Sequence, residues 1–104
     1  MNKNEIEAML DEIGISVHMS GYKYLIEMLI LKDKIDYSEK FEIVKNYEIV
    51  AKKFCQKPHN IERAIRYITI KNAKQIKDFF GVSYKITNLN FVELLHRHMK
   101  KGGK

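Results

Sequence analysis

Apolar residues recur at helical spacing along most of the chain. Near the N-terminus they follow the i, i+3, i+4, i+7 pattern of one helix face: Ile6, Met9, Leu10 and Ile13. Gly14 comes next, and glycine commonly ends a helix. The stretch over about 21–32 follows Ser20, a good capping residue, and is apolar on nearly every side. It predicts the central and most buried helix.

Capping residues divide the middle of the chain. Asp36 and Glu39 have the spacing of a capping box, which predicts a helix from there to about Lys45. Asn46 is placed to cap a further helix over about 47–54. The pattern therefore predicts two short helices on either side of Asn46.

The C-terminal half predicts three more helices. Pro58 suits the first turn of a helix that runs to about Ile70. A short helix over about 73–80 and an extended stretch over 82–86 lead to a last helix capped by Asn88. One side of that helix carries Phe91, Leu94, Leu95 and His98, with His98 expected to be packed or partly buried. We predict an all-α fold, a compact bundle of about six helices forming a single domain over 1–104.

The helices over 47–54 and 58–70, joined by about three residues, predict a helix-turn-helix. Ala51 is small, as a close helix crossing requires, and the apolar contacts between the two helices are predicted to come from Val50, Phe54 and Ile61. Two positions depart from the usual motif. Cys55 stands where a turn glycine is common, and Gln56 stands where an apolar residue is common.

Several function classes find no support in the sequence. The chain has one cysteine, too few for an internal disulfide, and lacks an apolar run of about 20 residues or a signal-peptide layout. We therefore expect a cytoplasmic protein without a membrane partner. No nucleophile–base pair, glycine-rich phosphate loop or paired-carboxylate motif is present, so we expect no enzyme and no cofactor. The four histidines do not have the spacing of a metal site.

Charge is distributed unevenly. Residues 1–50 carry six lysines and ten acids, a net −4, whereas residues 51–104 carry thirteen Lys and Arg and three acids, a net +10. Such asymmetry indicates a basic face that meets a polyanion. The alternative is a lysine-rich surface that serves only solubility.

The second helix of the predicted motif carries the chemistry for reading DNA bases. Arginine can bond guanine with two donors, asparagine suits adenine, and glutamate can accept from cytosine. With Ile61 buried, base-reading residues are predicted on the exposed side and its flanks: Asn60, Glu62, Arg63 and Arg66. Contacts to DNA phosphates are predicted for Lys52, Lys53, Lys57 and His59. His18 comes just before a helix start at Ser20, where it could contact a phosphate or could equally be a surface loop residue. The alternative is a solvated face on which Glu62 pairs with Arg63 or Arg66.

Particular runs of residues resemble the C-terminal effector domain of the stage-zero sporulation response regulator. The match is carried by Val50-Ala51-Lys52-Lys53-Phe54, Ile61-Glu62-Arg63-Ala64-Ile65-Arg66, Gly21-Tyr22-Lys23-Tyr24-Leu25 and Phe79-Phe80-Gly81. The resemblance implies a bacterial protein with a six-helix domain whose helix-turn-helix binds promoter boxes in the major groove. It also implies contact with the sigma subunit of RNA polymerase through about 71–80. A homodimer on DNA is a further possible arrangement.

The sequence also departs from that family. Asn60 stands where the family usually has arginine, and the segments after 70 and over 82–87 are several residues shorter. Only about a dozen residues precede the match, so we expect no receiver domain. The prediction is a sequence-specific DNA-binding transcriptional regulator with double-stranded DNA as its partner. The alternative is a protein-interaction module that binds RNA polymerase or a full-length regulator without specific DNA affinity.

Overall fold

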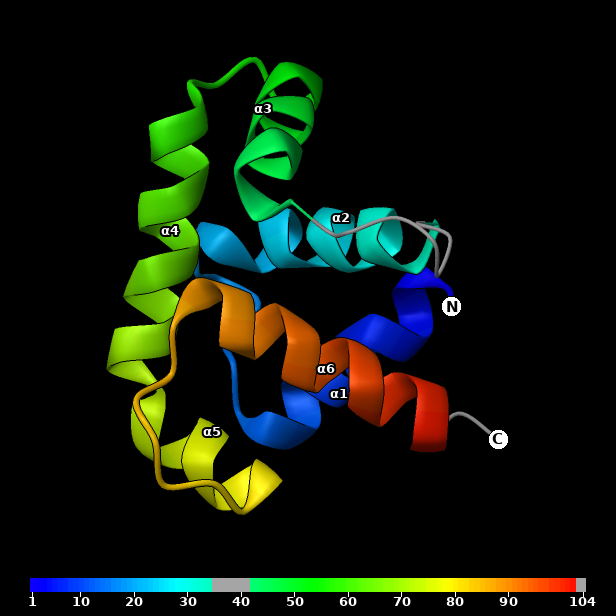
Figure 1. Cartoon of the computed structure of the whole chain (residues 1–104), viewed down its shortest axis with the longest axis vertical. Helices are drawn as coiled ribbons and strands as arrows, with labels where there is room; N and C mark the ends of the chain where they lie inside the picture. Colours follow the sequence, from blue (N-terminus) through cyan, green and yellow to red (C-terminus); the bar gives the residue numbers. More distant parts are fainter. Residues whose placement is uncertain (35–41, 103–104) are drawn as a thin grey trace.

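The computed structural model describes residues 1–34 and 42–102, and this part of the chain contains six helices and no strand. In chain order they are α1 (Lys3–Ile13), α2 (Gly21–Lys34), α3 (Ile43–Lys53), α4 (Pro58–Lys71), α5 (Ala73–Phe80) and α6 (Asn88–Gly102) (Figure 1). The predicted all-α fold of about six helices is confirmed. The segment over 82–86, predicted as extended, belongs to neither a helix nor a strand.

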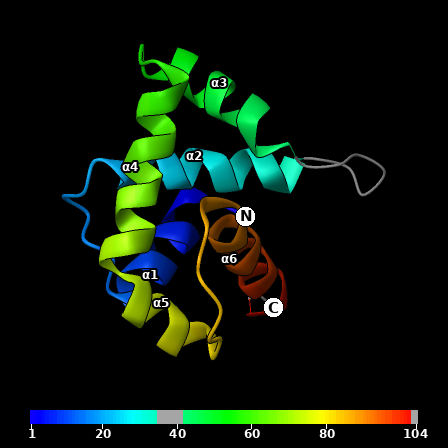
Figure 2. The ribbon, with the colours of Figure 1, turned by 60° about the vertical axis from the view of Figure 1, so that its left-hand side comes forward.

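Helix α2 lies at the centre of the bundle and packs against α1, α3, α4 and α6. Its Leu25, Met28 and Leu29 are completely buried, which confirms that it is the most enclosed helix. Helix α4 stands along one side of the molecule, with α3 at one of its ends and α5 at the other (Figures 1 and 2). The face of α4 that turns away from α2 is therefore open to solvent.

A single glycine permits the close crossing of α2 and α4. A Cβ atom added to Gly21 would lie 2.6 Å from the main-chain oxygen of Ala64 and 2.8 Å from Cδ1 of Ile68. A backbone oxygen cannot rotate away as a side chain can, so only glycine fits here without moving a helix. Gly21 thus sets the distance between the core helix and α4.

The predicted break at Asn46 is wrong. Helix α3 runs without interruption from Ile43 to Lys53, and Asn46 lies inside it, buried, with its side-chain nitrogen donating to the main-chain oxygen of Glu42 at 2.9 Å. An asparagine that bonds back to its own helix needs no capping position. The proposed capping box at Asp36 and Glu39 lies outside the described residues.

The predicted cap at Asn88 is also wrong. Thr87 and Asn90 cap α6 reciprocally: the amide nitrogen of Asn90 donates to Thr87 Oγ1 at 3.1 Å, and that of Thr87 donates to Asn90 Oδ1 at 3.3 Å. Asn88 is the first helical residue, and its side chain points into the protein. Thr87, Asn88 and Asn90 are all of residue types that cap helices, so the local sequence could not show which of them caps α6.

The prediction that His98 is packed or partly buried is confirmed only for the packing. His98 is exposed, although its ring packs edge-on against Phe79 and Phe80 at centroid distances of 5.1 and 5.9 Å. The neighbouring His96 is instead partly buried, with Nε2 3.1 Å from the Asp33 carboxylate of α2. Residues two apart on a helix point about 200° away from each other, so His96 and His98 lie on different sides of α6.

Candidate nucleic-acid interface

Helices α3 and α4 form the predicted helix-turn-helix, joined by residues 54–57. Val50, Ala51 and Ile61 are buried between them, as expected from the sequence. Phe54, at the end of α3, packs edge-on against Tyr24 of α2 with ring centroids 5.1 Å apart. The motif is therefore anchored to the central helix, which holds α4 in a fixed orientation.

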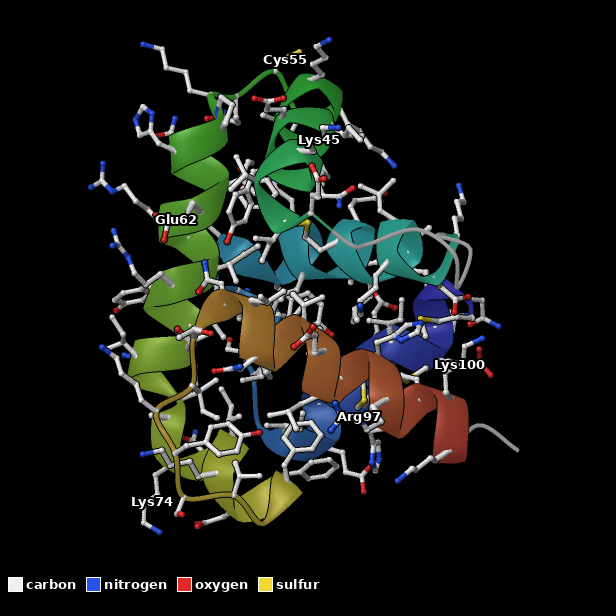
Figure 3. All side chains as sticks on the ribbon, viewed as in Figure 1. Lys45, Cys55, Glu62, Lys74, Arg97 and Lys100 are labelled. Atoms are coloured by element: carbon white, nitrogen blue, oxygen red, sulfur yellow. The ribbon has the colours of Figure 1, made fainter. Side chains whose placement is uncertain are left out.

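The turn contains a residue in a left-handed conformation. Cys55 has φ +54°, the one positive φ among the non-glycine residues that the structure describes. Glycine adopts this region without steric cost, whereas other L-residues do not. The helix-turn-helix thus keeps the backbone shape of a turn glycine at a position where the chain has cysteine. Cys55 is exposed at the end of the molecule where α3 and α4 meet (Figure 3).

The outer side of α4 is a solvent-exposed ridge. It exposes His59, Arg63, Arg66, Tyr67 and Ile70. A hollow of about 490 Å³ runs beside this ridge and is lined by Asn60, Arg63 and Tyr67 together with Ser20. The segment before α2 therefore lies next to α4, and His18, which is exposed, belongs to that segment.

Three of the four predicted base-reading side chains have partners within the protein. Asn60 is half-buried, and its side-chain nitrogen donates to Gln56 Oε1 at 3.2 Å, inside the turn. Glu62 lies 3.6 Å from Arg66 Nε, one helical turn away (Figure 3). Such an exposed pair contributes little stability, so Arg66 can exchange this partner for another anion. The Glu62–Arg66 pair, considered in the sequence analysis as the alternative to base reading, is therefore present in the structure.

The predicted phosphate-binding lysines differ in their surroundings. Lys52, on α3, and Lys57, in the turn, are both exposed. Lys53 instead extends to α2, where its ammonium lies 2.9 Å from the Glu27 carboxylate. A lysine whose charge is already matched attracts a phosphate less strongly than an unmatched one. Lys52 and Lys57 are therefore better placed than Lys53 to meet an anion.

A polar contact behind the ridge, missed in the sequence, fixes the backbone of α4. The Asn88 side-chain nitrogen donates to the Tyr47 hydroxyl and to the main-chain oxygen of Glu62, each at 3.0 Å. Burial, reinforced by the charge of Glu62, raises the pKa of Tyr47, although the Asn88 hydrogen bond opposes this shift. Asn88 thereby joins α3, α4 and α6 at one point. In the sequence it could not be told from an ordinary helix cap.

The comparison with protein families agrees with this arrangement. The family described as "Sporulation initiation factor Spo0A C terminal" matches residues 6–99. The chain belongs to this family. It is accordingly a DNA-binding domain of transcription regulation in sporulation, and the family is not one of enzymes. No solved structure matches the chain.

Two other structural features are absent from residues 1–34 and 42–102. No helix there is long and apolar enough to cross a membrane. No group of three or more His, Cys, Asp or Glu side chains gathers where it could hold a metal ion.

Proposed function

We propose that the domain binds double-stranded DNA in a sequence-specific manner, with α4 in the major groove. Arg63 and Arg66 would contact guanine edges, and Asn60 and Glu62 would contact adenine and cytosine. The observation that carries the proposal is the solvent-exposed ridge of α4, which presents both arginines from a helix-turn-helix anchored to the core. A rigid support is what precise base contacts require.

Phosphate contacts from the surrounding elements would fix the position of α4 on the duplex. We assign them to Lys52, Lys57 and His59 around the turn, and to His18 before α2. Lys53 would take part by exchanging Glu27 for a phosphate. These contacts orient the protein and carry no sequence information themselves.

Selection of bound oligonucleotides from a random pool tests the proposal most directly. The expected result is one enriched motif, which a gel-shift titration then finds bound far more tightly than random DNA at the same salt concentration. Recovery of unenriched sequences would contradict sequence-specific reading.

A second candidate function is a protein-interaction module that binds RNA polymerase, through its sigma subunit, or a full-length regulator. The feature that favours it is the direct junction of α4 and α5: Asn72 alone separates them, so the segment resembling the polymerase-contacting region is short. Pull-down of purified sigma subunit by a domain that shows no DNA preference would support this second function. Sedimentation of the domain on its selected site would decide whether it binds as a homodimer.

A further inference from the structure

A second hollow lies on the opposite side of the α4 ridge from the first. It has a volume of about 350 Å³ and is lined by the start of α3, by α4 and by residues 85–89, which include the first residues of α6. Small-molecule sites commonly have volumes of about 300–1,000 Å³ and combine apolar walls with a few polar groups. This cavity has a volume within that range and both kinds of lining residue.

The walls of the cavity are aliphatic. They are formed largely by Ile43, Ile70, Ile86 and Leu89. Ile70 is 67% exposed and Leu89 is 37% exposed, although both are large apolar residues. Covering such surface with an apolar group removes it from water, which is favourable.

Positive charge lies at the rim of the same cavity. Arg66 and Lys85 both line it, and Glu62 is the one acidic residue among the lining residues. Glu62 already lies 3.6 Å from Arg66, so the local net charge is positive. An arginine fork and a lysine ammonium bind a carboxylate well. The cavity therefore suits a ligand with an aliphatic body and an anionic head.

A buried polar group adjoins this site. Asn88 lines the cavity and is 9% exposed. Its nitrogen is used by the Tyr47 hydroxyl and the Glu62 main-chain oxygen, while its oxygen is buried without a hydrogen-bond partner among the described residues. A carboxylate has no hydrogen to donate to this oxygen, so Asn88 lines the cavity without binding an anion itself. Tyr47, which also lines the cavity, accepts from Asn88 and keeps its own O–H to donate.

We propose that this cavity binds a small aliphatic carboxylate and that its occupation weakens DNA binding. The carboxylate would pair with Lys85 and Arg66, and the aliphatic chain would lie against Ile70 and Leu89. Because Arg66 belongs to the ridge assigned to base reading, a bound anion would compete with DNA for its guanidinium. The second part of this proposal rests on the proposed function, whereas the first part does not.

Binding is tested by titrating the whole chain with octanoate while amide NMR signals are recorded. Octan-1-ol, which has the same chain length without the charge, serves as the matched ligand. We expect octanoate to shift signals of residues 85–89 and of Thr69 and Ile70, and to bind about tenfold more tightly than octan-1-ol. Lys85→Gln should reduce octanoate affinity about tenfold, to the level of the alcohol.

Two further variants control for folding and for general charge. Leu89→Trp fills the mouth of the cavity at a partly exposed position and should abolish binding while the remaining NMR signals stay unchanged. Lys101→Gln removes an exposed lysine that does not line this cavity and should bind octanoate as the wild type does. Shifts spread over other surfaces, or equal binding of octanoate and octan-1-ol, would overturn the proposed site.

The effect on DNA is measured separately, by titration of the selected DNA site at constant ionic strength. Octanoate should lower the DNA affinity of the wild type severalfold, relative to equimolar chloride, and leave that of Leu89→Trp unchanged. Octanoate binding without a change in DNA affinity would overturn the coupling. A protein that bound no DNA would overturn the proposed function, while the NMR titration would still decide the cavity.

Discussion

At the residue scale, Cys55 shows what a sequence pattern can and cannot tell. The helix-turn-helix was predictable from the apolar residues Val50 and Ile61 and from Pro58, because their spacing reflects the two helices directly. The strained backbone at Cys55 was not predictable. A cysteine in place of the turn glycine is equally compatible with a turn of a different backbone shape, in which no residue is left-handed. The structure retains the left-handed shape, with φ +54°.

Cys55→Gly should therefore stabilise the domain. Relief of the left-handed penalty exceeds the extra unfolded-state entropy of glycine, so we expect a gain of about 0.5–1 kcal/mol in the free energy of unfolding. Urea denaturation measures it. The matched control is Gly81→Ala: Gly81 has φ +67° and no atoms within 4 Å of an added Cβ, so the backbone strain alone should destabilise that variant by about 1 kcal/mol. A loss of stability in Cys55→Gly would contradict the strained turn.

At the scale of elements, packing determined what the sequence left undecided. The core helix over 21–32 and the glycine ends at Gly14 and Gly81 were predictable, because local chemistry fixes both. The division at Asn46 was wrong because an asparagine can bond back within a helix as readily as it caps one. Asn88 was misread for a similar reason, since its partners Tyr47 and Glu62 are distant in sequence.

Gly21→Ala tests the close crossing of α2 and α4. The added methyl group would meet the backbone of Ala64, so the helices must separate, and we expect a loss of about 1–3 kcal/mol in the free energy of unfolding. Ala8→Gly provides a contrasting control, because Ala8 is exposed within α1. This variant should lose about 1 kcal/mol in the free energy of unfolding through the lower helix propensity of glycine alone. Only Gly21→Ala should also shift NMR signals along α4. Unchanged α4 signals would show that this crossing tolerates a side chain.

At the scale of the whole molecule, Asp33 links the N-terminus and the C-terminal part of α6 to the core. Its carboxylate lies 3.1 Å from His96 Nε2, 3.3 Å from Lys100 Nζ and 3.7 Å from the α-amino group of Met1. Burial would raise the pKa of Asp33, but the hydrogen bonds from His96 and Lys100, with the positive charges of Lys100 and the α-amino group, lower it.

This depressed pKa has a consequence for acid stability. The ionised carboxylate stabilises the fold above its unfolded-state pKa of about 3.9, and that contribution disappears as the pH falls through the lower folded-state value. Asp33→Asn should thus be less stable than the wild type at pH 7, by about 1 kcal/mol, and the difference should shrink below about pH 4. Thermal unfolding at several pH values measures it. A difference that stays constant down to pH 2 would argue against an ionised Asp33 contact.

The charge distribution predicts the salt dependence of DNA binding. With roughly six to eight phosphate contacts from the basic half, affinity should fall about a thousandfold between about 50 and 200 mM salt. Fluorescence anisotropy with one labelled duplex at several salt concentrations gives the slope of log affinity against log salt. A flat slope would contradict a phosphate-binding basic face.

The central claim, that α4 reads bases, is tested most directly by measuring how well Arg63→Ala discriminates between the selected site and a site with one guanine replaced. An arginine–guanine contact provides about 1–3 kcal/mol of discrimination, whereas a lysine–phosphate contact carries no sequence information. We expect Arg63→Ala to lose discrimination at one base pair, and Lys57→Ala to weaken both sites equally. If Arg63→Ala kept the wild-type preference at every position of the site, the assignment of α4 as the reading helix would be wrong.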